Sequence, residues 1–353
     1  MAKGKQTNRV DDVRIDATRP LVSPAILMEE VPNSEANTAF LSQSRETARA
    51  IVAGEDLRLM VVVGPCSIHD TVAARDYAEW LKERADTYAE RLFIVMRSYF
   101  EKPRSTVGWK GFINDPDLDG SHRINKGLRE ARTLLRDIAD LGLPTATEFL
   151  DMIAPQYIAD FVTWGAIGAR TVESQPHREL ASGLSMPVGF KNATDGRVQS
   201  AVEGVIAARE PHWFASATKD GVAAHFRSTG NDTCHVILRG GSKTGPNYSA
   251  ESVAEACKIL GKAGLTERLM IDCSHANSGK DPARQPEVLA DIVGQLRSGS
   301  RSILGVMIES NLVAGRQEVV EGESLVYGQS ITDGCVDLDT TDEMLEVLAH
   351  AIG

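Results

Sequence analysis

The chain has 353 residues, of which 42% are hydrophobic and 25% are charged, a composition typical of a soluble globular protein. Its formal net charge of −11 disfavours nucleic acids and anionic membranes as partners, and no stretch approaches the roughly 20 apolar residues that span a bilayer. Five cysteines at irregular spacing, and an N-terminus without the apolar core of a signal peptide, predict free thiols and a cytoplasmic protein.

Residues 1–56 are expected to form an N-terminal extension. Met1–Asn8 is expected to be disordered and Asp11–Ile15 to be a short strand, followed by a linker that contains several prolines. A helix is predicted from residues 33–34, which supply its cap, to Gly54, which ends it. Because the extension is too small for a domain, we expect it to pack on the following domain or on another subunit, in regulation or oligomerisation.

Eight short apolar runs follow, and each is expected to be a buried β-strand. The first, Leu59–Val63, is unbroken, which is typical of a strand in a parallel sheet covered on both faces. The others are Leu92–Met96, Leu143–Phe149, Trp164–Ala169, Pro187–Phe190, Cys234–Leu238, Leu269–Cys273 and Ile303–Ile308. Strands that alternate with helical segments and end in polar residues predict an α/β fold, a (β/α)8 TIM barrel over residues 57–353.

Helices are expected where apolar residues recur at a spacing of three or four. After the first strand, Ala74, Tyr77, Ala78 and Leu81 form one apolar stripe that faces the barrel. Further helices are predicted over residues 128–138, 198–208, 253–260, 288–296 and 343–352.

One segment departs from this alternation. His212–Phe226 has strand character on both sides of Asp220 and Gly221, which is a hairpin signal. It predicts a β-hairpin within residues 211–230, inserted between the fifth and sixth barrel strands. Thr171–Pro187 is also long for a connection. Such additions serve regulation, and the alternative is that they only build the interface of a dimer or tetramer.

Four side chains with ligating atoms come from different barrel segments: Cys66, His275, Glu309 and Asp333. Each alone has an ordinary explanation, since a cysteine after a strand is usually a small buried residue. A barrel brings the ends of its first, seventh and eighth strands side by side. A thiolate, an imidazole and two carboxylates suit Mn²⁺, Fe²⁺, Co²⁺ or Zn²⁺ better than Mg²⁺. Cys273 lies inside its strand and is expected in the core.

Positively charged side chains also gather at the strand ends, namely Arg97, Lys102, Arg104, Arg170, Lys191 and Arg239. Surface salt bridges would explain any one of them. Six on one face of an acidic protein indicate instead a substrate with more than one phosphate or carboxylate. The chain has no G-x-G-x-x-G sequence and no P-loop, which disfavours a dehydrogenase that binds a dinucleotide. The residues by themselves thus predict a metal-assisted barrel enzyme that acts on small polyanions.

Longer motifs carry a resemblance to a known family. They are GPCSIHD (64–70), RSYFEKPR (97–104), VGWKG (107–111), GAIGAR (165–170), GFKN (189–192), ILRGG (237–241), DCSHAN (272–277) and YGQSITD (327–333). Together they resemble the type I 3-deoxy-D-arabino-heptulosonate 7-phosphate (DAHP) synthases, in the amino-acid-regulated branch with an N-terminal extension. That family joins phosphoenolpyruvate to D-erythrose 4-phosphate and releases phosphate, the first step of the shikimate pathway to the aromatic amino acids.

The resemblance implies roles for the residues at the strand ends. It makes one divalent metal ion the cofactor, with the ligands Cys66, His275, Glu309 and Asp333. It implies that phosphoenolpyruvate is held by Arg97, Arg170, Lys191 and Arg239, with Lys102 and Glu148 close to the reacting carbons. It implies that erythrose 4-phosphate meets Lys102, Pro103, Arg104 and Ser105. The remaining substrate-binding residues are Gly168, Ala169 and Asp333, and the catalytic set is Lys102, Cys66, His275 and Glu148.

The same resemblance implies feedback inhibition by an aromatic amino acid. The effector pocket would be formed by Asp151, Met152, Gln156, Leu180, Leu184, Ser185, Phe214 and Ser216. Since Ser216 leaves less room for a phenolic hydroxyl than a glycine would, phenylalanine is favoured over tyrosine, with tryptophan third. A homo-oligomer, either a dimer or a tetramer, is expected.

Two other functions stay open. The sister synthase that uses arabinose 5-phosphate shares the chemistry, although the Lys102–Ser105 stretch and the N-terminal extension favour the four-carbon aldose. The second is a catalytically silent amino-acid sensor on the same barrel. The presence of every predicted metal ligand and cation argues against it, because a silent protein would not need them. The chain also departs from the family pattern in two places: Ser105 stands where threonine is common, and the loop Ser242–Asn247 looks longer than usual.

Overall fold

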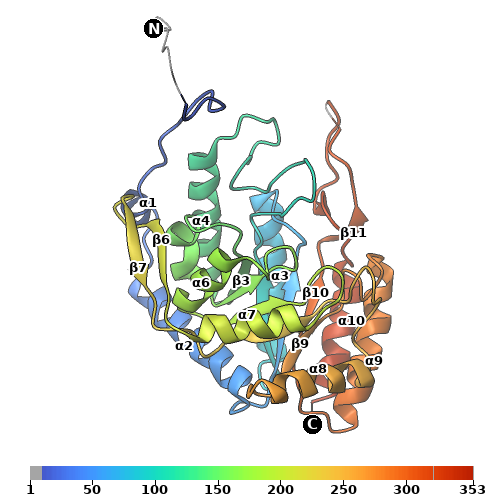
Figure 1. Cartoon of the computed structure of the whole chain (residues 1–353). Helices are drawn as coiled ribbons and strands as arrows, with labels where there is room; N and C mark the ends of the chain where they lie inside the picture. Colours follow the sequence, from blue (N-terminus) through green and yellow to red (C-terminus); the bar gives the residue numbers. More distant parts are fainter. Residues whose placement is uncertain (1–9, 321, 353) are drawn as a thin grey trace, which may run out of the picture.

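The computed structural model describes residues 10–320 and 322–352. Within them, eight parallel strands close into a barrel in the order β1-β10-β9-β8-β5-β4-β3-β2 (Figure 1). These strands are β1 (Leu59–Gly64), β2 (Leu92–Arg97), β3 (Thr145–Glu148), β4 (Trp164–Ile167), β5 (Val188–Lys191), β8 (His235–Leu238), β9 (Leu269–Asp272) and β10 (Ile303–Glu309). The predicted (β/α)8 barrel is confirmed, and each predicted strand overlaps one of these strands.

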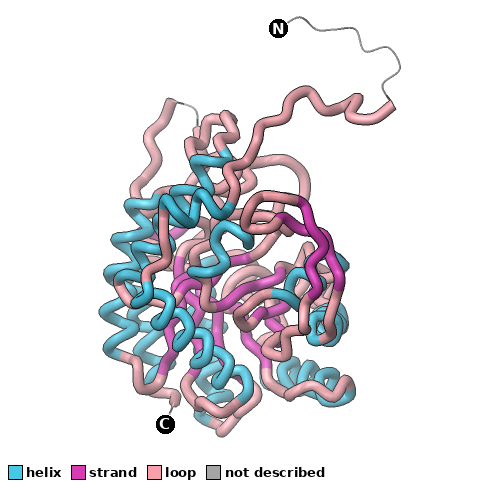
Figure 2. Tube along the Cα trace, turned by 90° about the vertical axis from the view of Figure 1, so that its left-hand side faces the viewer, coloured by secondary structure: helices cyan, strands magenta, loops and turns pink. Residues whose placement is uncertain are grey.

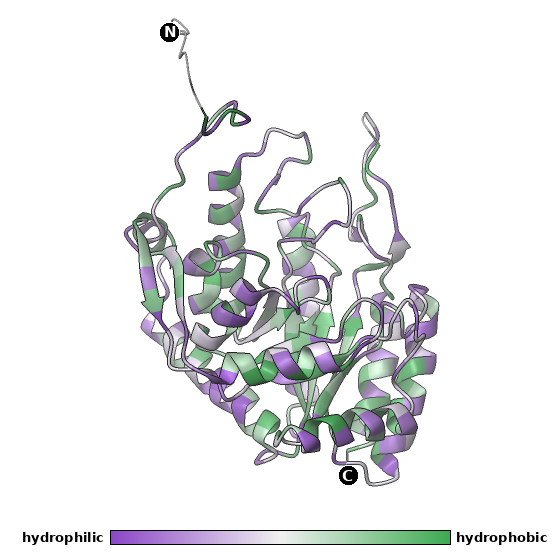
Figure 3. Ribbon diagram, viewed as in Figure 1, coloured by the Kyte–Doolittle hydropathy of each residue, from purple (hydrophilic) through white to green (hydrophobic). Residues whose placement is uncertain are grey.

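The barrel strands form the centre of the molecule because their side chains are mostly apolar and buried. β1 and β10 are buried along their whole length. Figure 3 shows the barrel strands in the green of hydrophobic residues, surrounded by helices whose outer faces are purple. In the pairing of β1 with β10, Gly64 lies opposite Glu309, the last residue of each strand. Parallel register therefore brings the carboxyl ends of the strands to one rim, where function collects in this fold.

Helices cover the outside of the barrel, as the cyan tube around the magenta strands shows (Figure 2). They are α3 (Thr71–Thr87), α4 (Ile124–Asp140), α5 (Pro155–Ile158), α6 (Gln175–Gly183), α7 (Gln199–Arg209), α8 (Ala250–Lys262), α9 (Gln285–Arg297) and α10 (Leu338–Ala349). The predicted helices are confirmed, and two helices appear where none was expected: the short α5, and α6 inside Thr171–Pro187. No helix in the described part of the chain is long and apolar enough to cross a membrane.

The N-terminal extension holds two helices where one was predicted. α2 (Glu35–Ala53) begins at the Ser34 cap and ends at Gly54, as expected. α1 (Pro24–Glu30) lies in the segment expected to be a linker. Its hydroxyl cap at Ser23 accepts a hydrogen bond from a backbone amide, and proline at the first helical position needs no hydrogen-bond partner for its nitrogen. The signal for this helix was therefore present in the sequence.

The predicted strand at Asp11–Ile15 is wrong. These residues form a turn in which the Ile15 amide donates to the Asp12 carbonyl. Val13 and Ile15 are exposed, and no described strand pairs with this segment, so its apolar residues have no sheet to join. Met1–Asn8, predicted to be disordered, lies outside the described residues.

The predicted hairpin between the fifth and sixth barrel strands is confirmed. β6 (Trp213–Ala217) pairs antiparallel with β7 (Ala223–Arg227), and Gly221 takes the left-handed conformation in the turn. The hairpin lies beside α1 (Figure 1), and the Ala25 amide of α1 donates to the Lys219 carbonyl at 2.7 Å. A second small sheet, β11 (Val313–Arg316) with β12 (Gln329–Ser330), follows β10.

One buried arginine joins the extension to the barrel. Arg132 on α4 donates from Nε to the carbonyl of Val31, which follows α1, at 2.9 Å. Its Nη1 donates to the Tyr157 carbonyl at 2.8 Å, and its two Nη groups pair with both carboxylate oxygens of Asp160 at 2.6 and 2.9 Å. A guanidinium removed from water is tolerated when its donors are engaged in this way.

Replacing Arg132 with methionine is expected to lower the free energy of unfolding by about 3 kcal/mol, because Asp160 and two buried carbonyls lose their donor. A guanidinium chloride titration measures this loss. Arg129→Met is the matched control: Arg129 lies on the same helix, but its ion pair with Glu30 is exposed, so a loss of at most about 1 kcal/mol is expected. Equal losses in the two variants would contradict the role given to Arg132.

Candidate active site

The rim at the carboxyl ends of the strands surrounds a cavity of about 240 Å³, here called the rim cavity. Its lining consists of residues 102–107, Glu148, Gly168, Ala169, Arg170, Lys191, Thr194, Arg239, His275, Lys280, Thr332 and Asp333. Every predicted substrate-binding residue is in this set except Arg97, which is fully buried. Of the four predicted metal ligands, His275 and Asp333 line the cavity, whereas Cys66 and Glu309 are buried.

Three of the four predicted metal ligands form a cluster among the described residues, and the fourth, His275, lies beside it. One ligating atom from each of Cys66, Glu309 and Asp333 lies within 4.8 Å of the other two. The Nε2 atom of His275 is 3.9 Å from the carboxylate of Glu309. Cys66 and Glu309 meet because Gly64, at the end of β1, is the register partner of Glu309, at the end of β10.

The chemistry of this donor set fits a divalent metal ion. The Cys66 and Glu309 side chains are withdrawn from water. Burial, and next the Glu309 carboxylate, raises the pKa of the Cys66 thiol. Burial also favours a neutral Asp333, yet the positive charges of Lys102 and neighbouring cations lower the pKa of that carboxyl. A divalent cation would balance this concentration of anionic donors, and it would ionise a coordinating thiol.

Asp272, the last residue of β9, was quoted in a motif but given no role by the sequence analysis. Its fully buried carboxylate accepts a hydrogen bond from Lys191 Nζ at 2.9 Å and lies 2.9 Å from His275 Nδ1. Burial would raise the pKa of Asp272, but Lys191 and His275 hold it well below its ordinary value. Asp272 thus orients one predicted metal ligand and one predicted substrate cation. Its position at a strand end, three residues before His275, was an available signal.

Two arginines at the rim of the barrel have buried donor atoms without a partner among the described residues. Arg97 donates from Nη2 to Glu309 Oε1 at 3.1 Å, but its Nη1 has no acceptor. The Nε of Arg239 is likewise buried and unpaired. Leaving a buried charged donor without an acceptor is costly, so both atoms indicate the place of an anionic ligand.

The cations of the rim do not behave as surface salt bridges. Arg97 and Lys191 have buried carboxylate partners, Glu309 and Asp272. Arg104, Arg170 and Arg239 form no ion pair with any described carboxylate. Their charge is available to a ligand.

The segment that begins at Lys102 carries the residues predicted to meet the aldose. Lys102 Nζ donates to the Cys66 carbonyl at 2.9 Å, and Ser105 Oγ accepts from Arg170 Nε at 3.2 Å, so the two predicted substrate sites adjoin. Glu101, directly before Lys102, is buried. Burial, and next the Asp151 carboxylate that is hydrogen-bonded to it, raises the pKa of Glu101 to about 8. This contact joins the segment to the loop after β3.

Glu148, the last residue of β3, lies against the backbone of the loop after β4. A Cβ added to Gly168 would come within 2.0 Å of Glu148 Oε1. Glycine at this position therefore lets the carboxylate occupy its place in the rim cavity. The rim cavity also includes Thr194, Thr332 and Lys280, which the sequence analysis did not identify. For Lys280 the available signal was its place five residues after His275.

A second cavity, of about 380 Å³, lies between the hairpin and α6 and is here called the hairpin cavity. Five of the predicted effector residues line it: Gln156, Leu180, Leu184, Ser185 and Phe214. Phe214 stacks on Phe226 across the hairpin with ring centroids 5.9 Å apart, and Phe226 also lines the cavity.

The other three predicted effector residues are not in the lining of the hairpin cavity. Ser216 Oγ donates to the Met152 carbonyl, so these two residues join the hairpin to the loop after β3. The Asp151 carboxylate accepts hydrogen bonds from the amides of Ile153 and Ala154 in the same loop. Arg45 and Lys219, which line the cavity, were not predicted.

Comparisons with known proteins agree on one family. The model of the DAHP synthetase I family matches residues 33–346. The Phe-sensitive phospho-2-dehydro-3-deoxyheptonate aldolase of Escherichia coli K12 is 54% identical over 342 residues, 97% of each chain. The Trp-sensitive enzyme of Salmonella typhimurium is 51% identical over 345 residues, 98% of this chain and 99% of that one. The structure of phospho-2-dehydro-3-deoxyheptonate aldolase from Francisella tularensis has a TM-score of 0.94 and 55% identity, covering 96% of this chain and 98% of that one. Because the family model, the relatives and the barrel structure agree over nearly its whole length, the chain belongs to the DAHP synthetase I family.

Proposed function

We propose that this protein is a DAHP synthase, the enzyme of the first step of the shikimate pathway. It joins C3 of phosphoenolpyruvate to the aldehyde carbon of D-erythrose 4-phosphate, adds water at C2 and releases phosphate. The observation that carries this proposal is a cavity in which a metal-type donor cluster adjoins cations that have no ion-pair partner among the described residues. Membership of the DAHP synthetase I family supports the same reaction.

Cys66, His275, Glu309 and Asp333 would hold one divalent ion per subunit. The mixture of thiol, imidazole and carboxylates favours Mn²⁺, Fe²⁺, Co²⁺ or Zn²⁺ over Mg²⁺. When bound, the ion supplies Lewis-acid polarisation of the aldehyde oxygen.

Phosphoenolpyruvate is assigned to the inner part of the rim cavity. Its phosphate and carboxylate repel each other, so several cations are needed to hold both groups in one geometry. Arg97, Arg170, Lys191 and Arg239 supply that charge, and the unpaired Nη1 of Arg97 and Nε of Arg239 are free to donate to it. Much of the rate enhancement then comes from positioning.

Erythrose 4-phosphate is assigned to Lys102, Pro103, Arg104 and Ser105, with the backbone at Gly168 and Ala169 and the Asp333 carboxylate completing the wall. As C3 of phosphoenolpyruvate attacks the aldehyde carbon, positive charge develops at C2, and the Glu148 carboxylate balances it. Water adds at C2. The cations around the phosphate then stabilise the leaving group as the C–O bond breaks.

Release of phosphate from phosphoenolpyruvate in the presence of Mn²⁺ tests this proposal. We expect release with erythrose 4-phosphate and not with arabinose 5-phosphate. Preference for arabinose 5-phosphate would identify the sister synthase. Release with neither aldose would identify a silent sensor.

Removal of the metal is expected to abolish phosphate release, and added Mn²⁺ or Co²⁺ to restore it. Cys66→Ala should stay folded but lose the metal, because a ligand at a strand end is replaced by a smaller residue. Metal content and turnover are the measurements. Cys273→Ala is the matched control, since Cys273 is equally buried but is not in the donor cluster, and it should retain both. Full turnover in excess chelator would refute the metal assignment.

We further propose that an aromatic amino acid binds the hairpin cavity and inhibits the enzyme. Leu180, Leu184 and Phe214 would hold the ring. Gln156 and Ser185 offer polar partners to its ammonium and carboxylate groups, with Asp151 in the adjoining loop. The relatives named Phe-sensitive and Trp-sensitive support an aromatic effector. Phenylalanine is favoured, then tyrosine, then tryptophan, although Ser216, on which the sequence-based order depends, is not in the lining of the hairpin cavity.

Phe214→Ala is expected to weaken inhibition by phenylalanine while leaving the uninhibited rate nearly unchanged, because the stacked ring is lost from the cavity wall and the rim cavity is untouched. Inhibition curves for the three aromatic amino acids measure this. Trp213→Ala is the matched control, because Trp213 precedes Phe214 on β6 but is 66% exposed. If saturating phenylalanine, tyrosine and tryptophan all leave the wild-type rate unchanged, the hairpin is only an assembly surface.

A homo-oligomer, either a dimer or a tetramer, and a cytoplasmic location complete the proposal. The N-terminal segment supports self-association, since Val13 and Ile15 are exposed on an arm that leaves the body of the molecule (Figure 1). Apolar side chains displayed in this way are typical of an interface.

A further inference from the structure

The rim cavity has an outer neighbour, a second cavity of about 530 Å³, here called the outer cavity. The two cavities share part of their lining, which places Ser105, Arg170, Thr194, Arg239 and Lys280 on the wall between them. Lys280 is the charged member of this wall to which neither the sequence nor the proposed function gives a role.

The backbone holds Lys280 in an unusual conformation. Lys280 has a φ of 65°, directly after Gly279 with a φ of 64°. Its amide donates to the carbonyl of His275 at 2.6 Å, and His275 itself has a φ of 55°. Left-handed backbone is unfavourable for residues with a side chain, so these contacts impose it. The turn from His275 to Lys280 fixes the lysine beside the predicted metal ligand.

Lys280 forms no ion pair within 4.0 Å of any described carboxylate, although its charge acts on the nearby Asp333 carboxylate. Arg197, which lines the outer cavity as well, is neutralised by Asp195 at 2.8 Å and Glu173 at 3.0 Å. Lys280 and Arg170, by contrast, form no described ion pair. Hydroxyl groups of Ser105 and Thr194 lie on the same wall. Arg170 donates from Nε to the Ser105 hydroxyl at 3.2 Å. Cations and hydroxyls grouped in this way make a site for a phosphate dianion.

The position of Lys280 indicates which phosphate it meets. Arg97 and Lys191 are buried, whereas Lys280 is exposed at the outer end of the rim cavity, on the same wall as Ser105. In a four-carbon aldose phosphate the phosphate lies at the opposite end of the chain from the aldehyde. With the aldehyde at the buried donor cluster, the phosphate points towards the exposed end.

We propose that Lys280 binds the phosphate group of the aldose phosphate, together with Arg104 and Ser105. This inference rests on the proposed function. Arg104 and Ser105 come from the loop after β2. Lys280 would be a third residue that binds the phosphate, and it comes from the loop after β9. The lysine acts as a point charge at the entrance of the cavity, so it attracts the second substrate and holds its phosphate end.

Steady-state kinetics of Lys280→Met test the inference. We expect kcat/KM for erythrose 4-phosphate to fall about tenfold or more, mainly through KM, because a charge-assisted contact to phosphate is lost. KM for phosphoenolpyruvate and the affinity for Mn²⁺ should stay at the wild-type values. Lys280→Arg should restore most of the loss, since the charge returns, and a purely structural role would not be restored in this way.

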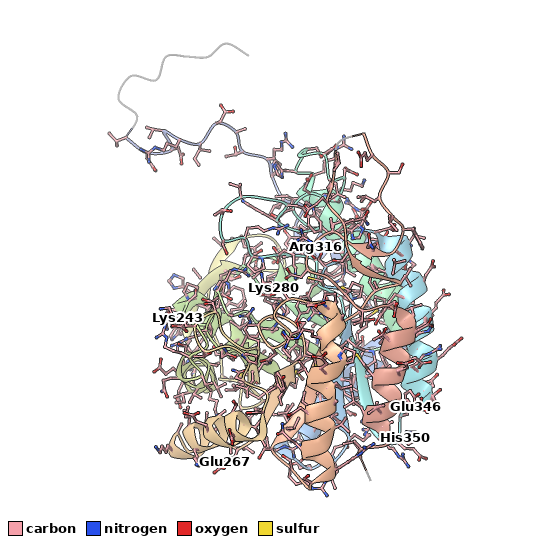
Figure 4. All side chains as sticks on the ribbon, turned by 90° about the vertical axis from the view of Figure 1, so that its right-hand side faces the viewer. Lys243, Glu267, Lys280, Arg316, Glu346 and His350 are labelled. Carbon is pink, nitrogen blue, oxygen red and sulfur yellow. The ribbon has the colours of Figure 1, made fainter. Side chains whose placement is uncertain are left out.

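Lys243→Met is the matched control. Lys243 is an exposed lysine of the neighbouring loop after β8 and lines neither cavity; Figure 4 shows it at the edge of the molecule, away from Lys280. An unchanged kcat/KM in Lys280→Met, an equal loss in Lys243→Met, or a loss seen only against phosphoenolpyruvate would overturn the inference. Absence of wild-type turnover with the two substrates would instead overturn the proposed function, so the two failures are distinguishable.

Discussion

The candidate active site depends on one buried carboxylate, that of Asp272. At the end of β9 it contacts Lys191 Nζ and His275 Nδ1, both at 2.9 Å, with no exposure to water. These two groups, with the amide and hydroxyl of Ser274, stabilise the buried carboxylate, and the same contacts fix the positions of Lys191 and His275. His275 then presents its other ring nitrogen towards Glu309, and Lys191 presents its ammonium to the rim cavity. Support of this kind for a metal-binding histidine sets both its orientation and its basicity.

The barrel makes this arrangement possible, and the barrel was predictable. Unbroken apolar runs such as Leu59–Val63 identify strands buried on both faces, and their parallel closure alone brings Cys66 next to Glu309. The sequence failed where local pattern and tertiary context disagree. Asp11–Ile15 has apolar residues but no sheet to join, and Thr171–Pro187 contains a short helix without a clear apolar stripe.

Which residues belong to the site could be predicted better than which of them contact one another. The residues at strand ends follow from the fold, whereas the pairing of Asp272 with Lys191 joins residues 81 positions apart in the sequence. The turn that places Lys280 beside His275 depends on left-handed backbone that only the folded chain reveals. Arg132 is a similar case. From the sequence alone an arginine on α4 is expected to be exposed, because its partners Val31 and Asp160 lie in other segments of the chain.

A short series of contacts joins the hairpin cavity to the rim cavity. On the hairpin, Ser216 donates to the Met152 carbonyl; the adjacent Asp151 shares a hydrogen bond with Glu101, the residue before Lys102. A ligand that moves the hairpin therefore acts on the loop assigned to the aldose. An effector that binds one position of the hairpin more tightly than another would shift the population of that loop, as feedback inhibition requires.

The affinity of Asp272→Asn for Mn²⁺, measured by competition with a chelator, shows whether the buried carboxylate orients His275. Asp272 is not itself a predicted metal ligand; it contacts one of them, His275. The variant therefore keeps all four donors. If the buried carboxylate orients His275, the dissociation constant for Mn²⁺ should rise by about 10- to 100-fold while the protein stays folded. A folded variant that binds Mn²⁺ as tightly as the wild type would contradict the account.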